Sequence, residues 1–440
     1  MTVENAAIGQ QDFEQRNAPS VGCICMTNTH ALGRTYPTFF ITRPLDRPGR
    51  CARRIIFRRV SQNRQLFGHL QLRHAFHICS KGKTSSADDG FLSNSSHIKV
   101  QETIIARTAA QHWIEPHPHG IYVRPADMWI DPSGPQAKAL VTHGHADHAR
   151  GGHGDVWATP ETLAIMALRY GTELGTPMAY GEQININGVR ISFHAAGHVL
   201  GSAQILLEHA GERVVVTGDY KRRPDPTCKL FEVVPCDVLI TEATFGLPVF
   251  KHPPIEDEIA KLLEARVANP EGCILVGAYA LGKAQRVIAE LRAAGHHDPI
   301  YIHGAMQKMC ELYEAHGVAL GELVLATGLP KTAMRSSIVV APPSALNDRW
   351  ARRLPEPVTA MASGWMRVRQ RARQKNVELP LIISDHADWD ELTGTLRELR
   401  PAETWITHGR TDALSRWCEL HQLKARALDL VGREEDEGEG

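Results

Sequence analysis

The chain has 440 residues, of which 43% are hydrophobic, and its 49 Asp and Glu balance its 49 Lys and Arg at a formal net charge of zero. A chain of this length and composition can build sizeable cores in two or three domains. Its nine cysteines, an odd number without a CxxC pair, argue against a disulfide framework or a Cys-based zinc finger. No apolar run approaches the ~20 residues of a membrane span, and the beginning of the chain lacks the layout of a signal peptide, so we expect a cytoplasmic protein.

Residues 1–105 differ from the rest of the chain in charge, with 14 Lys and Arg against 7 Asp and Glu. Their hydrophobic residues follow neither a helical nor a strand period. Two interpretations are open: a disordered basic extension, which we favour, and a basic arm that adds non-specific affinity for nucleic acid. The remaining residues are mildly acidic and end in an acidic tail, 433–440. This balance still permits a nucleic-acid enzyme, because only the binding groove must be basic.

Residues 112–245 are rich in predicted strands. Short apolar or alternating runs predict strands over residues 120–123, 127–130, 139–141, 189–194, 204–208, 213–217 and 238–241. The first two form a hairpin. A proline in the first turn, followed by apolar residues at helical spacing, predicts a helix over 160–170.

Residues 250–375 alternate between helical and strand patterns. The expected helices cover 254–267, 283–294, 305–316 and 345–353, and the expected strands cover 273–276, 299–302 and 337–341. Such alternation predicts a parallel sheet with helical crossovers, in a separate α/β domain. Residues 379–383 and 404–406 return to strands that end in polar motifs like those of the first segment. We therefore expect the α/β domain to be inserted into the first domain.

The densest cluster of reactive side chains follows the strand at 139–141. It consists of His143, His145, Asp147 and His148. Because successive side chains of a strand point to opposite faces, these four converge from the loop past its carboxyl end. Two imidazoles, a carboxylate and a third imidazole suit zinc, and they are enough to begin two sites. The alternative, a polar loop that is rich in His by chance, is disfavoured by this density of ligands.

Four more apolar runs end in a ligand-type residue. These residues are His198, Asp219, His386 and His408. Each is weak evidence alone, because a single His at a strand end is more often a satisfied surface or core residue. Their joint occurrence after the first cluster favours one shared metal site.

Taken in order, the motifs resemble those of the metallo-β-lactamase fold family. Those that carry the resemblance are Asp131, the cluster at 143–148, His198 and Asp219. Three later motifs resemble its β-CASP branch of nucleases, and these are Glu242 in Thr-Glu-Ala-Thr-Phe-Gly, His386 in Ser-Asp-His-Ala-Asp-Trp and His408 in Thr-His-Gly. Within that branch, Thr-His-Gly-His-Ala-Asp-His-Ala-Arg and Ser-Gly-Trp-Met-Arg-Val-Arg are most similar to bacterial ligase-associated DNA damage response exonucleases. The resemblance covers about 112–432.

The resemblance implies an α/β fold. Residues 112–245 and 379–432 would form a metallo-β-lactamase αββα sandwich, and 250–375 would be the inserted β-CASP domain. It also implies two zinc ions, with manganese as an alternative. One zinc would be held by His143, His145 and His198, and the other by Asp147, His148 and His408, with Asp219 as the bridge between them.

The family pattern also suggests roles for other side chains. Asp131 has no obvious place among the ligands and would orient a ligand imidazole. His386 would be the general acid that protonates the leaving oxygen, and Glu242 would orient it; the alternative for Glu242 is a surface acid at a strand end. Local capping is the alternative for Asp385 and Asp388, and we prefer it for Asp388, as the N-cap of a helix over 389–399.

Candidate substrate-binding residues are Lys283, Arg286, Trp365, Arg367 and Arg369. Lys283 opens a helix whose N-terminus could hold a phosphate. On an extended segment, alternating arginines at 367–373 would share a face and follow a phosphate backbone while Trp365 stacks on a base. A solvated run of charge is the alternative.

The function implied is a metal-dependent nuclease, a DNA exonuclease in repair, that uses a metal-bound hydroxide to attack the scissile phosphate. The first alternative is an RNA endo- or exonuclease of the cleavage and polyadenylation type, with which a His at the position of His408 is associated. A non-catalytic scaffold is disfavoured by the intact ligand set, and a hydrolase of small thioesters or lactams by the large inserted domain. Nucleic acid, DNA before RNA, is the expected partner, and association with a DNA ligase rests on the resemblance alone.

Overall fold

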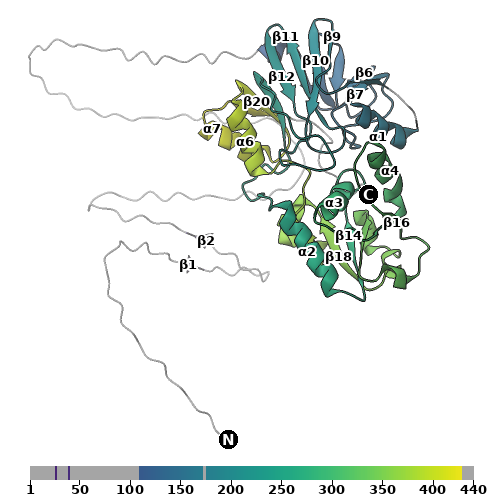
Figure 1. Ribbon diagram of the computed structural model, residues 1–440. Helices are drawn as coiled ribbons and strands as arrows, with labels where there is room; N and C mark the ends of the chain where they lie inside the picture. Colours follow the sequence, from purple (N-terminus) through teal and green to yellow (C-terminus); the bar gives the residue numbers. More distant parts are fainter. Residues whose placement is uncertain (1–24, 27–37, 40–108, 172–174, 429–440) are drawn as a thin grey trace, which may run out of the picture. The chain divides into compact units, whose positions relative to one another are not determined.

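The computed structural model describes residues 25–26, 38–39, 109–171 and 175–428 (Figure 1). Contacts divide the chain into two units, Met1–Ile98 and Lys99–Gly440. In the first unit the described residues form the strand pair β1 (Cys25–Met26) and β2 (Thr38–Phe39). The predictions of a basic extension over 1–105 and of an acidic tail over 433–440 concern residues that are almost all outside the described part. All other described residues belong to the second unit.

The second unit is a mixed α/β structure with three large sheets, of which the first has six strands. Across this sheet the strands are β3 (Ile114–His117), β4 (Gly120–Val123), β5 (Met128–Ile130), β6 (Lys138–Leu140), β7 (Asp155–Ala158) and β8 (Thr176–Pro177). The predicted hairpin is present as β4 and β5. The predicted ligand strand is β6, and the predicted helix is α1 (Pro160–Tyr170), whose N-cap is Thr159.

The second sheet has seven strands and draws them from two separate parts of the chain. In spatial order they are β21 (Ala425–Ala427), β20 (Glu403–Gly409), β13 (Val238–Ala243), β12 (Glu212–Val216), β11 (Ala203–His209), β10 (Val189–Ala195) and β9 (Gln183–Ile186). Pairing of β13 with β20 joins residues about 165 apart in sequence. The long segment between β13 and β20 is therefore inserted between two strands that are neighbours in this sheet.

Alternation along the strands of the second sheet decides what each face contacts. On β12, Val214 and Val216 join a core cluster that also contains residues of the first sheet, whereas Val215 points to the opposite face. That face is covered by α6 (Trp389–Leu399) and α7 (Thr411–Leu420). The outer face of the first sheet contacts α1 through a smaller cluster. One apolar layer thus lies between the two sheets, and helices cover the other faces.

The third sheet is parallel and has six strands. In spatial order they are β16 (Leu323–Leu325), β15 (Ile300–Ile302), β17 (Ser337–Ala341), β14 (Cys273–Gly277), β18 (Pro357–Ala362) and β19 (Leu379–Leu381). The helices around it are α2 (Ile255–Ala268), α3 (Lys283–Ala293) and α4 (Gln307–Ala315) on one face, and α5 (Arg369–Gln374) with short 3-10 segments on the other. Both faces are therefore buried, which is why its strands read as continuous apolar runs.

Three expectations for this region were wrong. β19 was expected to return to the first domain, but it pairs with β18 of the third sheet. Residues 345–353 were expected to form a helix but form two 3-10 turns, Pro343–Asn347 and Ala351–Arg353, because the backbone is extended at Asp348 between them. The segment 363–373, expected to be extended, is helical: it contains a 3-10 turn, Gly364–Arg367, and α5 (Arg369–Gln374).

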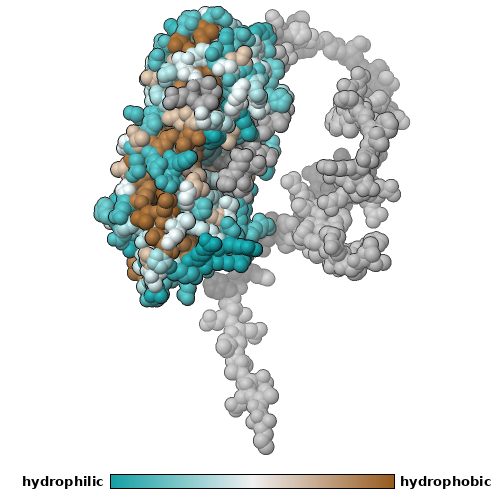
Figure 2. All heavy atoms as spheres, turned by 90° about the vertical axis from the view of Figure 1, so that its right-hand side faces the viewer, coloured by the Kyte–Doolittle hydropathy of each residue, from teal (hydrophilic) through white to brown (hydrophobic). Residues whose placement is uncertain are grey.

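The surface of the described part is mixed in polarity. Figure 2 shows apolar patches on one face that are interrupted by hydrophilic residues. None of the helices in the described ranges has both the length and the apolar character that a membrane crossing requires. Among the exposed large apolar side chains is Leu420 of α7, at 64%.

The apolar layer between the first two sheets should contribute strongly to the stability of this unit. Leu207 of β11 is fully buried in it, so Leu207→Ala should lower the free energy of unfolding by about 2–5 kcal/mol. The same substitution at the exposed Leu420 should change it by less than about 0.5 kcal/mol. Urea denaturation of both variants measures this difference, and equal effects would contradict the assigned core.

Candidate metal centre

The residues predicted as metal ligands lie together at the ends of strands of the two facing sheets. His143, His145 and His148 come from the loop after β6, His198 from the turn after β10, and Asp219 from the segment after β12, while His408 lies in the last residues of β20. Ligand atoms lie within 4.8 Å of one another in two groups that share Asp219. The first contains His143, His145, His198 and Asp219, and the second His148, Asp219 and His408.

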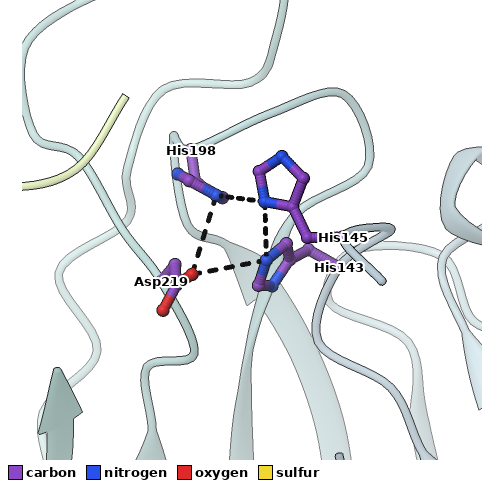
Figure 3. A group of neighbouring side chains, drawn as sticks. All are labelled: His143, His145, His198 and Asp219. Atoms are coloured by element: carbon purple, nitrogen blue, oxygen red, sulfur yellow. Dashed lines mark hydrogen bonds and ion pairs between the residues drawn. The ribbon is translucent and has the colours of Figure 1, made fainter. Parts of the chain in front are cut away.

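The first group has the geometry of a four-coordinate site (Figure 3). Nδ1 of His145 lies 3.1 Å from Nε2 of His143 and 3.0 Å from Nε2 of His198. Oδ2 of Asp219 lies 3.4 Å and 3.8 Å from the same two Nε2 atoms. Four ligand atoms at zinc-ligand distances around one ion are separated by about 3.3 Å at tetrahedral geometry. The three imidazoles and one carboxylate therefore fit a divalent metal ion.

The second group surrounds a buried nitrogen. Nε2 of His148 has no hydrogen-bond partner within the described part of the chain, although it is inaccessible to solvent. It lies 3.4 Å from Oδ2 of Asp147 and 3.4 Å from Oδ2 of Asp219. Oδ1 of Asp219 lies 3.1 Å from Nε2 of His408. Oδ2 of Asp219 thus faces imidazoles of both groups, His143 in the first and His148 in the second, as a carboxylate shared between two sites would.

The outer nitrogen of each imidazole in these groups also has a polar neighbour. Nδ1 of His198 donates to the backbone oxygen of Asp385 at 2.8 Å. The corresponding contacts are His145 Nε2 to Leu281 O, His148 Nδ1 to Asp131 Oδ2, His143 Nδ1 to Thr142 Oγ1 and His408 Nδ1 to Thr407 Oγ1. Such contacts fix the ring orientation and leave the inner nitrogen with a lone pair for a metal.

The electrostatics of the centre favour a bound cation. Burial lowers the pKa of His143, His145 and His198, so these rings stay neutral, which is the form that binds metal. Burial alone would also lower the pKa of His148, but the carboxylates of Asp147, Asp219 and Asp131 hold it well above its ordinary value. Those carboxylates stabilise positive charge at His148, whether it is a proton or a metal ion.

Asp131 is held beneath the ligand loop rather than among the ligands. Its carboxylate accepts from the backbone nitrogen of Thr142 at 2.8 Å, from the hydroxyl of Thr142 at 2.7 Å and from Nδ1 of His148 at 2.8 Å. Its backbone is in the left-handed region, with φ 43°, where non-glycine residues are uncommon. This placement puts the carboxylate against Nδ1 of His148, while the orienting role itself stays a prediction.

Glycines make the turns that carry His198 and Asp219. Gly197 has φ +74°, and a Cβ there would lie 2.2 Å from the backbone oxygen of Lys221. Gly218 has φ +57°, and a Cβ there would lie 2.8 Å from the side chain of Thr142. Any larger residue would therefore displace the ligand that follows.

His386 and Glu242 form a buried pair next to the first group. Nδ1 of His386 lies 3.2 Å and 3.1 Å from the two oxygens of Glu242, which also accepts from the backbone nitrogen of Tyr220 at 2.8 Å. The rings of His386 and His198 are 4.5 Å apart. The structure thus places the predicted acid and its carboxylate beside the candidate ligands. With Asp219 they form a third group of converging ligand-type atoms.

Lys283 and Arg286, predicted to bind substrate, are instead enclosed in the protein. Nζ of Lys283 lies 2.8 Å from Oδ2 of Asp385, and both residues are at most 5% exposed. Arg286 contacts Asp385 and the carboxylate of Asp225. Asp385, for which local capping was one interpretation, is therefore the centre of an ion-pair group that sequence reasoning missed. Its position next to His386 was the available signal.

The predicted contacts at Trp365 and the following arginines also need correction. Because 363–373 is helical, Arg367 and Arg369 do not alternate along an extended face. The guanidinium of Arg371 lies 4.0 Å from the centre of the Trp365 ring. Phe245 and Phe250 pack against the same ring. A base could not stack on the face that Arg371 covers, while Arg367 and Arg369 remain exposed.

Asp388 takes the predicted role of helix N-cap. Its Oδ1 accepts from the backbone nitrogens of Asp390 and Glu391 at 3.0 Å, and the side chain of Glu391 accepts from the backbone nitrogen of Asp388. The other oxygen accepts from the backbone of His252. Capping is thus confirmed, and the residue also joins α6 to the segment after β13.

Known proteins similar to this chain fall into two groups. A probable DNA ligase of Opitutus terrae is 29% identical over 327 residues, which cover 72% of this chain and 31% of that protein. Cleavage and polyadenylation specificity factor subunit 3 of Dictyostelium discoideum is 33% identical over 30% of this chain and 18% of that protein. Endoribonuclease YSH1 of Candida glabrata is 40% identical over 25% of this chain and 14% of that protein. This chain therefore spans a third or less of each of these relatives. No protein-family model matches it.

The role of Asp131 can be tested by metal affinity. Asp131→Asn keeps the size of the side chain but removes the charge beside His148, so the affinity of the protein for Zn²⁺ should fall about ten- to hundredfold. Competition with a chelator measures this. Asp155→Asn, at an exposed carboxylate of β7, is the matched control and should leave the affinity unchanged. Equal affinities for all three proteins would contradict the orienting role.

Proposed function

Because the chain is homologous to the β-CASP nucleases with the metallo-β-lactamase fold, we propose that it is a metal-dependent phosphodiesterase that cleaves nucleic acid, and specifically a DNA exonuclease in repair. The observation that carries the proposal is the convergence of two imidazole and carboxylate groups on Asp219, with the His386–Glu242 pair beside them. This is a site for hydrolysis that uses metal ions and a separate proton donor.

The fold assignment belongs to the same proposal. The apolar layer shared by the first two sheets, with α1 on one outer face and α6 and α7 on the other, supports an αββα sandwich. The parallel sheet and its helices support the assignment of the inserted segment, expected over 250–375, as a β-CASP domain; it continues through β19 before the chain returns to the sandwich.

We propose two Zn²⁺ as the native metal ions, with Mn²⁺ as the alternative. The first would be held by His143, His145 and His198, the second by Asp147, His148 and His408, and both by Asp219. When bound, such ions lower the pKa of water to about 7 and neutralise charge on the phosphoryl oxygens. The residues around them keep the imidazoles in the neutral form and in fixed orientations.

His386 would supply the proton for the leaving oxygen. Its Nδ1 is directed to the carboxylate of Glu242, which leaves Nε2 to donate. Glu242 is itself oriented by the backbone nitrogen of Tyr220. The carboxylate stabilises the charged imidazole, so the ring can hold a proton until the scissile bond breaks.

DNA is favoured as substrate by the extent of the similarities. The match to the probable DNA ligase covers 72% of this chain, whereas the matches to the two RNA-processing relatives cover 30% and 25%. An association with a DNA ligase is part of this proposal. RNA is the second candidate, because the similarity to the endoribonucleases is higher in identity and because His408 is the residue that the family pattern associates with RNA enzymes. A cytoplasmic location stays a prediction.

End-labelled DNA and RNA strands of matched sequence separate these candidates. With Zn²⁺ or Mn²⁺, the protein should shorten DNA in single-nucleotide steps and leave RNA intact. Nδ1 of His145 lies close to the ring nitrogens of both His143 and His198 in the first group. His145→Ala removes this candidate ligand and should abolish cleavage. Internal cuts in RNA alone would contradict the DNA assignment and support the second candidate. Cleavage that persists in His145→Ala would contradict the metal mechanism itself.

The acid role of His386 predicts a loss of rate without a loss of metal. His386→Ala should lower kcat by about 10²- to 10⁴-fold, because the leaving oxygen then departs without a positioned proton donor. The protein should still retain its zinc. His421→Ala, at an exposed His after α7, is the control and should keep the parent rate. Steady-state kinetics and metal analysis of both variants test this, and zinc loss in His386→Ala would make His386 a ligand instead.

A further inference from the structure

The helix α3 of the third-sheet region contacts the segment that holds the candidate metal ligands, although it carries no ligand itself. Its first turn contains Lys283 and Arg286, which are 5% and 3% exposed. Both side chains face Asp385 of the segment between β19 and α6. Because burial of unpaired charge is costly, this arrangement needs all three groups in place.

The contacts of Asp385 divide between its side chain and its backbone. Its carboxylate lies 2.8 Å from Nζ of Lys283 and 3.3 Å from Nη1 of Arg286. Its backbone oxygen accepts the hydrogen bond from Nδ1 of His198 at 2.8 Å. Arg286 also donates to the backbone oxygen of Ser384 at 2.5 Å. The two cations therefore fix the peptide that orients the imidazole of His198.

The pKa shifts of Asp385 and Arg286 agree with a stable ion pair between them. Burial alone would raise the pKa of Asp385, but Lys283 and Arg286 hold it below its usual range. Burial alone would lower the pKa of Arg286, but the carboxylates of Asp225 and Asp385 raise it above its ordinary value, so the guanidinium stays charged. The pKa shifts of Asp385 and Arg286 therefore both favour the charged forms that make the ion pair.

Other contacts from the same region reach the first ligand group. The backbone oxygen of Leu281, just before α3, lies 3.4 Å from Nε2 of His145. A Cβ at Gly282 would lie 2.5 Å from the side chain of Val199, next to His198. The hydroxyl of Tyr313 on α4 accepts from the backbone nitrogen of Leu200. Two of the three imidazoles in this group are thus supported from outside the sheets that carry them.

We propose that Lys283 and Arg286 are positioning residues for the metal centre, and that they act through Asp385 on His198 rather than on the substrate. This inference rests on the proposed metal-dependent function and deepens it. It assigns to the inserted region a part in forming the first metal site, in addition to any contact with nucleic acid. It also replaces the phosphate-binding role that the sequence suggested for these residues.

The test separates positioning from substrate binding. In the full-length protein without nucleic acid, Lys283→Met should lower the affinity for Zn²⁺ about ten- to hundredfold, as loss of an orienting contact does. Kinetically, kcat should fall while KM is retained. Lys283→Arg, which keeps the charge, should restore most of the affinity. Lys331→Met, at an exposed lysine of the same region, is the matched control and should behave as the parent.

A double-mutant cycle shows whether Lys283 acts through Asp385. If it does, Lys283→Met combined with Asp385→Asn should be no worse than the more severe single variant, whereas independent effects would multiply. Circular dichroism shows whether each variant is folded. If Lys283→Met does not fold, Asp385→Asn still tests the role of the ion pair between the two residues. A raised KM with unchanged zinc affinity would overturn the inference and restore a substrate contact. Failure of the parent protein to bind either Zn²⁺ or Mn²⁺ would instead overturn the proposed function.

Discussion

The arrangement of the candidate metal centre depends on the contacts that the carboxylate of Asp219 makes. Its Oδ2 faces His143 and His148, and its Oδ1 faces His408. Burial would raise its pKa, but the neighbouring His148 and His386 lower it well below the ordinary value, so it is ionised. A buried anion of this kind requires compensating positive charge. Bound metal ions would supply that charge, and the residues around Asp219 are spaced for them.

Two kinds of packing position this centre, and they differ in their physics. The two facing sheets are held by an apolar layer, which is non-directional and stabilises roughly in proportion to buried area. The contact of α3 with the segment that carries Asp385 includes buried ion pairs, through Lys283, Arg286 and Asp385. Buried ion pairs add little net stability because desolvation offsets attraction, but they tolerate few geometries. Apolar burial thus stabilises the scaffold, and the ion pairs fix the orientation of the ligands.

The strand ends could be predicted from the sequence because their pattern is local. An apolar run followed at once by His or Asp marks both the strand and its ligand, and this predicted β6, β10 and β12 together with the placement of their polar ends. The helical form of 363–373 was missed because alternating arginines do not distinguish a strand from an exposed helix. The burial of Lys283 was missed because its partner, Asp385, is about a hundred residues away. Pairing at that distance leaves no local signal.

The contacts that orient these side chains form a closed ring, and this ring links the candidate ligands to the candidate acid. The peptide nitrogen of Tyr220, next to Asp219, holds Glu242, and Glu242 holds His386. The backbone oxygen of Asp385, next to His386, holds His198, whose Nε2 lies 3.8 Å from Asp219.

A second contact joins segments 219–220 and 385–387 directly, from the nitrogen of Ala387 to the oxygen of Tyr220 at 2.6 Å. A displacement of either segment would therefore move a candidate ligand and the candidate acid together. The proposed hydrolysis would need its proton donor at a fixed position relative to the metal site, and this ring of contacts holds His386 at such a position more directly than either sheet does.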